Sequence, residues 1–165
     1  MRGKLHFALG MAAGAYGAYM IMKTGRESTA AAFGISTAIG SIFPDIDMPE
    51  STISRRCRIT SAVINRRFGH RGFLHTPLFY AIVCLVVKAL GHEGAALYGF
   101  CFGAALHILQ DMCTRGGIML FFPILRWRIH LTPFRSGHWT NLLCTLLIGA
   151  LMIPLLTTFL KGGFL

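Results

Sequence analysis

The chain has 165 residues, of which 54% are hydrophobic and only 13% are charged. Soluble domains carry about 25% charged residues, so this composition excludes an ordinary soluble globule. A disordered chain needs low hydrophobicity and a disulfide-stapled mini-domain needs dense cysteines, so both are excluded too. The length fits a single domain over residues 1–165. Two classes remain, a small polytopic membrane protein and an unusually apolar helical domain.

Five apolar segments predict helices, at residues 5–22, 29–43, 76–90, 95–109 and 140–160. A helix needs about 20 apolar residues to cross a hydrocarbon core of about 30 Å, and the first and fifth segments provide them. The three middle segments have 15 residues each, so they are either buried helices or spans in a locally thinned bilayer. We expect spans, because five such segments leave little surface to keep the chain in water. The predicted fold is an all-α, polytopic membrane bundle of about five segments.

The basic residues predict the orientation of this bundle. If all five segments cross, twelve of the sixteen Lys and Arg residues lie on one side. The positive-inside rule places that side, and with it the N-terminus, in the cytoplasm.

The basic segment 54–71 contains six arginines and has two interpretations. An arginine run can bind nucleic acid, or it can anchor the topology by touching anionic lipid. Ile59 and Val63 interrupt the arginines, so we favour the lipid anchor and expect no nucleic-acid partner.

Two further features are typical of ordinary membrane-protein structure. The five cysteines include no C-x-x-C pair, which indicates reduced thiols, and Cys113 is disfavoured as a metal ligand because thiolate sites usually group several cysteines. The apolar run 118–125 is followed by Arg126, Trp127 and Arg128, a pattern typical of an interfacial anchor. We expect the stretch 118–139 to lie along the cytoplasmic surface or dip into it, where it could gate lipid entry.

The ionisable residues near the apolar segments are the functional candidates, because membrane segments rarely tolerate such groups. The chain has six acids and seven histidines. Seven of these residues lie at four segment ends that alternating spans bring to one side: His6, Asp45, Asp47, His70, His75, His107 and Asp111. The sequence therefore predicts that four imidazoles and three carboxylates converge at one membrane depth.

Local spacing supports this convergence. His107 and Asp111 are four residues apart and share a helix face. Pro44 should end the second segment, and the stretch from Pro44 to Pro49 is predicted to be extended, so that side chains two residues apart point the same way. Both aspartates in it, Asp45 and Asp47, could then face one ion.

The turn before the third segment is also patterned. Glycines around His70 permit a tight turn, and Thr76 is a plausible N-cap with Pro77 in the first helical position. Each of these patterns alone is more often a capping pair, a helix-ending turn or a snorkelling side chain. It is the location of all of them at one membrane depth that favours a metal site.

Imidazoles and carboxylates together suit zinc, iron or manganese, whereas magnesium and calcium prefer oxygen ligands alone. Seven possible ligands exceed the needs of one tetrahedral ion, so we expect one or two divalent ions, with zinc as the first choice.

The same motifs carry a family resemblance. Pro-Asp-Ile-Asp at 44–47, Gly-His-Arg-Gly-Phe-Leu-His-Thr at 69–76 and His-Ile-Leu-Gln-Asp-Met at 107–112, with His6 and the tail 120–128, resemble the YdjM-like family of LexA-regulated inner-membrane metal-dependent hydrolases of bacteria. The resemblance implies a membrane-bound hydrolase of phospholipase-like activity. No proposed ligand is lost at the three positions that depart from the family pattern, Met48, Thr76 and Arg115.

The predicted function is therefore a metal-dependent hydrolase that acts on a phosphate ester of a lipid or lipid-linked substrate at the cytoplasmic face of the bacterial inner membrane. The metal would activate water, Asp47 or Asp111 would act as general base, and Arg71 or Arg115 would hold the phosphate. The alternatives are a non-catalytic metal transporter or sensor with the same ligands, and a scaffold whose basic cytoplasmic segment binds a partner. Transport is disfavoured because transporter sites usually lie near the bilayer midplane.

Overall fold

The structure is a computed structural model, and it describes residues 3–48, 51, 54–69, 71–92, 94–132 and 138–162. Its helices are α1 (Gly3–Met22), α2 (Glu27–Gly40), α3 (Arg58–Phe68), α4 (Pro77–Ala89), α5 (Ala95–Met112) and α6 (His138–Lys161). Two 3₁₀ turns, η1 (Phe43–Asp47) and η2 (Phe73–His75), and an antiparallel pair of strands, β1 (Ile118–Met119) and β2 (Arg128–Ile129), complete the described elements. The prediction of an all-α bundle is confirmed.

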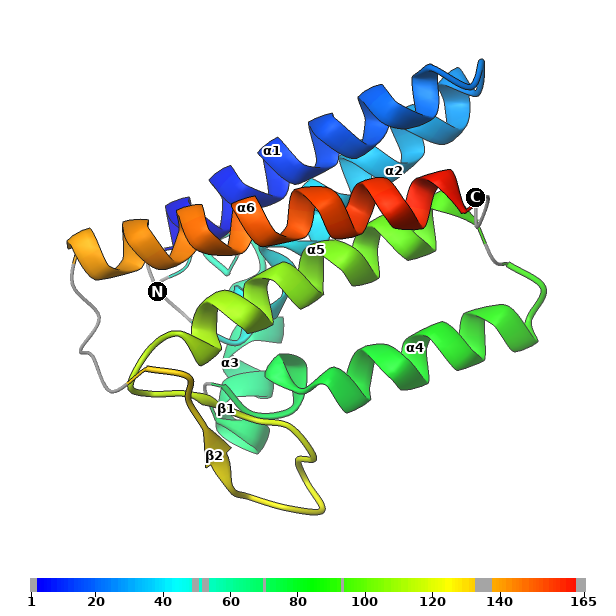
Figure 1. Cartoon of the computed structure of the whole chain (residues 1–165). Coiled ribbons are helices and arrows are strands. Elements are labelled where there is room, and N and C mark those ends of the chain that lie inside the picture. The colour runs from blue at the N-terminus through cyan, green and yellow to red at the C-terminus, as the bar shows by residue number, and fades with distance from the viewer. Residues whose placement is uncertain are drawn as a thin grey trace.

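The bundle is organised around α5, which contacts α1, α2, α4 and α6. Helices α1, α2, α5 and α6 run alongside one another, while α4 diverges from α5 along much of its length (Figure 1). By length and composition, three segments in the described part are able to cross a membrane: α1, the α2–η1 segment Glu27–Asp47, and Trp139–Lys161 of α6. Helix α4 is apolar but has only 13 residues, about 20 Å at 1.5 Å per residue. It is therefore shorter than the ~30 Å core that we expected it to span.

Glycines allow three of these helices to approach closely. Gly14 of α1 faces α2 so tightly that a Cβ atom there would lie 2.7 Å from the carbonyl oxygen of Gly34. At Gly103 of α5 the added carbon would meet the Thr37 carbonyl and lie 2.8 Å from the Ser41 nitrogen. Small residues at such crossings let backbones pack in lipid, and here they fix α1 and α5 against α2.

We expect Gly103→Ala to destabilise the bundle by about 1–3 kcal/mol, because the methyl group must displace backbone atoms that cannot rotate away. Unfolding of the purified protein in detergent, followed by circular dichroism, measures the change. Gly149→Ala is the matched control, since a Cβ there meets only Cδ1 of Leu9, at 3.3 Å. Equal midpoints for the two variants would contradict this account of the packing.

One end of the bundle collects the segment ends that carry ionisable residues. The starts of α1, α4 and α6 and the end of α5 lie at the same end of the molecule (Figure 1). There η1 contacts α2, α5 and η2, and η2 contacts α4. At the start of α4, Thr76 accepts a hydrogen bond from the Leu78 amide at 3.3 Å, with Pro77 in the first turn. The predicted N-cap is confirmed.

The prediction of an extended stretch after Pro44 is wrong. Residues Phe43–Asp47 form a 3₁₀ turn with Pro44 near its start, a position where proline loses no helical hydrogen bond. At three residues per turn, side chains two positions apart diverge by about 240°. As a result Asp45 and Asp47 point to different partners instead of facing one point side by side.

The basic segment forms a helix that docks on η1. Asn65 of α3 donates a hydrogen bond to the carbonyl oxygen of Asp47 at 2.7 Å, while Ile59 and Val63 point outward with exposures of 83% and 58%. The segment after α5 forms the β1–β2 hairpin, with Ile118 opposite Ile129. Residues 133–137 of the predicted surface stretch lie outside the described residues.

Candidate metal centre

Four elements bring imidazole and carboxylate groups together in the interior. Helix α1 contributes His6, η1 contributes two aspartates, η2 contributes His75, and α5 contributes His107 and Asp111. Each of these six side chains belongs to a residue that is no more than 8% exposed: His6, Asp45, Asp47, His75, His107 and Asp111. Buried ionisable groups at this density are costly unless they pair or bind a metal.

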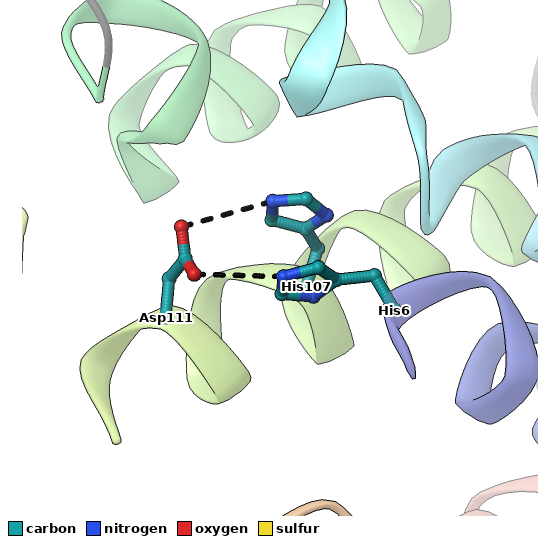
Figure 2. A group of neighbouring side chains, drawn as sticks. All are labelled: His6, His107 and Asp111. Carbon is teal, nitrogen blue, oxygen red and sulfur yellow. Dashed lines mark ion pairs between the residues drawn. The ribbon is translucent and has the colours of Figure 1, made fainter. Parts of the chain in front are cut away.

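Asp111 is the centre of the cluster. Its Oδ1 lies 3.5 Å from Nε2 of His6, and its Oδ2 lies 3.5 Å from Nε2 of His75 and 3.8 Å from Nε2 of His107. The rings of His6 and His107 stack with centroids 3.7 Å apart, and Figure 2 shows both facing the Asp111 carboxylate. One carboxylate therefore faces three imidazoles from three elements.

Asp45 closes the cluster on another side. Its Oδ1 lies 3.6 Å from Nε2 of His107. Two overlapping groups of possible metal ligands result, one made of His6, His107 and Asp111 and one of Asp45, His75 and His107, and within each group the ligand atoms lie within 4.8 Å of one another. Since His107 belongs to both groups, the five side chains form one cluster.

In two of the imidazoles, those of His107 and His6, a hydrogen bond at Nδ1 determines that Nε2 is the nitrogen that faces the cluster. Nδ1 of His107 lies 2.7 Å from the Ser41 carbonyl oxygen. A carbonyl oxygen can only accept, so Nδ1 carries the proton. Nε2 of the neutral ring then presents a lone pair toward the carboxylates, and it makes no hydrogen bond within the described part of the chain.

His6 is held in the same way by a longer relay. Its Nδ1 donates to Oε1 of Gln110 at 2.9 Å. The Gln110 amide nitrogen donates to the Thr145 hydroxyl at 2.9 Å, and that hydroxyl donates to the Asn141 carbonyl oxygen at 2.8 Å. The direction of each bond fixes the next, so the neutral form of His6 presents its Nε2 lone pair to Asp111.

Asp47 and Arg71 form an outer layer. Oδ2 of Asp47 lies 3.2 Å from Nδ1 of His75 and accepts the backbone N–H of Arg71 at 3.2 Å. The Arg71 guanidinium donates through Nη2 to Oδ1 of Asp111 at 2.9 Å and through Nη1 to the Thr114 hydroxyl at 3.0 Å. Both groups therefore orient side chains that face the centre.

The geometry and the donor set fit a divalent transition metal. A tetrahedral ion with ligands at roughly 2.0–2.2 Å places neighbouring ligand atoms about 3.3–3.6 Å apart. The nitrogen–oxygen distances at the centre are 3.5, 3.5, 3.6 and 3.8 Å. Lone pairs of neutral imidazoles that face carboxylate oxygens favour a cation between them, and the N and O donor set suits zinc, manganese or iron.

Five of the seven predicted ligands thus meet at one place: His6, Asp45, His75, His107 and Asp111. Asp47 contacts the cluster through His75. The seventh, His70, lies outside the described residues. Burial raises the pKa of the nearby Cys113 thiol to about 11.

Three residues that orient the centre were not identified from the sequence: Ser41, Gln110 and Thr145. Of the three, Gln110 would have been the easiest to identify from the sequence, because it is a polar residue next to Asp111 in an apolar helix. The structure shows that its side chain is fully buried. Ser41 acts through its backbone carbonyl, for which no side-chain pattern exists. Thr145 reaches Gln110 only through the packing of α6 on α5.

An apolar helical bundle with buried imidazoles and carboxylates at one end defines an integral membrane protein with a cluster able to hold a metal. The chain belongs to the YdjM inner membrane protein family, whose model matches residues 1–163. It is 34% identical over 117 residues to the inner membrane protein YdjM of Escherichia coli strain K12, covering 66% of this chain and 59% of that relative. It is also 34% identical over 123 residues to the uncharacterized protein YvsG of Bacillus subtilis strain 168, covering 74% of each chain. No solved structure matches the chain.

Proposed function

We propose that this protein is a metal-dependent hydrolase that cleaves a phosphate ester of a lipid or lipid-linked substrate at the cytoplasmic face of the bacterial inner membrane. The observation that carries the proposal is the convergence of three imidazole Nε2 atoms on the carboxylates of Asp111 and Asp45. Two of these imidazoles are held by hydrogen bonds at Nδ1, so that Nε2 is the ring atom directed at the carboxylates.

We assign the residues at the centre three roles: metal binding, general base catalysis and stabilisation of the phosphate. His6, His75, His107 and Asp111 would hold a divalent ion, which supplies Lewis acidity and lowers the pKa of a coordinated water. Asp45 is the more solvent-accessible of the two η1 aspartates, with an exposure of 8% against 1% for Asp47. We therefore assign the general base to Asp45, in place of the Asp47 or Asp111 favoured by the sequence, because those two carboxylates already orient His75 and Arg71.

Arg71 supplies positive charge beside the reacting centre. Its Nη1 and Nη2 atoms are occupied by Thr114 and Asp111, and its buried Nε makes no hydrogen bond among the described residues. A phosphate oxygen bound beside the cluster would accept a hydrogen bond from this guanidinium, whose charge would stabilise the negative charge that develops on the phosphate. Hydrolysis adds the water oxygen to phosphorus, breaks the P–O ester bond, and delivers one proton to the leaving alcohol.

Lipid is the favoured substrate class because the centre lies at the ends of helices able to cross a membrane. With the orientation expected from the basic residues, these ends lie at the cytoplasmic headgroup level. A headgroup phosphate would approach the cluster without leaving the leaflet.

The test is hydrolysis by the purified chain in mixed micelles, after metal removal and after reloading with zinc, manganese or iron. We expect release of phosphate or of a phosphorylated headgroup from at least one class of phospholipid, with at least one metal and not after chelation. His92→Gln, at an exposed imidazole outside the cluster, should keep this activity, whereas His75→Gln should lose it. Stoichiometric metal without hydrolysis across the lipid panel would favour a metal sensor or transporter instead.

A further inference from the structure

The loop that connects β1 to β2 and continues beyond β2, residues 121–131, is the most unusual surface of the molecule outside the long helices. Its side chains are almost all exposed. Six of them are large and apolar, with exposures of 40–79%: Phe121, Ile124, Leu125, Trp127, Ile129 and Leu131. So many exposed apolar side chains on one loop indicate a surface that is covered in the working protein.

The base of this exposed loop is fixed to the metal-centre end of the bundle. The Leu131 amide donates to the Met112 carbonyl at 2.7 Å, and the Thr132 hydroxyl donates to the Cys113 carbonyl at 2.8 Å. On the other strand, Ile118 and Met119 are buried. The base of the loop therefore holds a defined position relative to α5.

Charge indicates what covers the loop. Arg126 and Arg128 flank Trp127, and no Asp or Glu follows Asp111 in the sequence. Alternating arginine and tryptophan with aliphatic neighbours suits a bilayer interface, where the indole lies at headgroup level and arginines meet lipid phosphates. The bilayer is within reach, because the base of the loop is hydrogen-bonded to the end of α5, beside helices able to span the membrane.

We propose that the exposed loop inserts into the interfacial region of the leaflet at the metal-centre end, with Ile124 and Leu125 at the acyl boundary and with Arg126 and Arg128 on the phosphates of anionic phospholipids. Such insertion fixes the depth of the metal centre relative to the headgroups. The proposal does not depend on hydrolysis, since it concerns only where the loop lies.

The chain provides its own probe, because it has two tryptophans, Trp127 and Trp139. In Trp139→Phe, Trp127 is the single reporter. The full-length variant is reconstituted into vesicles of phosphatidylcholine, alone or mixed with phosphatidylglycerol, in which one lipid carries brominated acyl chains. We expect bromolipid to reduce the emission by about half or more, brominated phosphatidylglycerol to quench more than brominated phosphatidylcholine, and aqueous iodide to quench weakly.

Two controls distinguish insertion into lipid from exposure to water and from contact with protein. Trp127→Phe leaves Trp139 to report on the start of α6, and Arg126→Gln with Arg128→Gln should abolish the preference for the anionic lipid while retaining insertion. Strong iodide quenching without bromolipid quenching would place the loop in water. Protection from both quenchers would place it against protein, such as a second copy of the chain, and either result would overturn the proposal.

Discussion

Asp111→Asn should reduce bound metal from about one ion per chain to a trace, and lipid hydrolysis should fall with it. Both oxygens of this carboxylate face imidazole nitrogens at 3.5 Å, so the substitution removes a charge that three histidines share. Loss of a residue that only orients a ligand typically costs about 10–100-fold in metal affinity. Loss of a direct ligand should therefore cost more than about 100-fold, which metal analysis after dialysis against a weak chelator would measure.

A matched control is Glu27→Gln, which neutralises an exposed acid at the start of α2, outside the cluster. It should leave metal content and activity unchanged. Because Asp111 also pairs with the largely buried Arg71 at 2.9 Å, its loss leaves an uncompensated charge, and the Asn variant must be shown to retain its helix content. His75→Gln, which removes no charge partner of Arg71, provides a second route to the same loss. Full metal content in both folded variants would rule out the proposed centre.

The gathering of the candidate residues could be predicted from the sequence because it depends on topology alone. When apolar segments alternate in direction, the start of the first, the end of the second, the start of the third and the end of the fourth lie together. The relative order of His6, Asp45, His75 and Asp111 along the chain therefore predicted one site without any coordinates. The helical pair His107 and Asp111 followed from a spacing of four residues.

The different directions in which the two η1 aspartates, Asp45 and Asp47, point could not be predicted in this way. Alternation in an extended strand and rotation in a 3₁₀ turn give opposite answers for residues two apart. Pro44 is compatible with both conformations, since its fixed backbone angle suits the first turn of a helix as well as an extended segment. Only the hydrogen bonds of the turn, from Asp45 to the Ile42 carbonyl and from Met48 to the Asp45 carbonyl, decide between them.

The residues that orient the candidate ligands, Gln110 and Thr145, also could not be predicted from the sequence, for a different reason. Gln110 points to His6 across 104 residues of sequence and to Thr145 across 35. Contacts of this range depend on how closely α1 and α6 pack on α5, which apolar composition does not determine. The resulting relay connects the candidate metal centre to a helix, α6, that contributes no ligand of its own among the described residues.

The hydrogen bonds from His6 through Gln110 to Thr145 give the second prediction with a large effect. We expect Gln110→Leu to lower the metal affinity by about 10–100-fold. Leucine has a similar volume, but it cannot accept the Nδ1–H of His6, so the buried imidazole loses the bond that fixes its tautomer and ring orientation. The measurement is competition for zinc with a chromophoric chelator. Cobalt absorption adds a readout of ligand geometry that a purely structural role would not change.

Conservative replacements distinguish hydrogen bonding from packing in this prediction. Gln110→Glu still offers an acceptor to His6 and should retain most of the affinity, as carboxylate–histidine pairs do at other metal sites. One step further out, Thr145→Val should weaken binding, because it removes the hydroxyl that accepts from Gln110 at 2.9 Å, whereas Thr145→Ser should restore it. If the leucine and valine variants are folded, bind zinc as tightly as the wild type and give an unchanged cobalt spectrum, then the relay does not position His6, and the orientation of this ligand must come from its stacking on His107 alone.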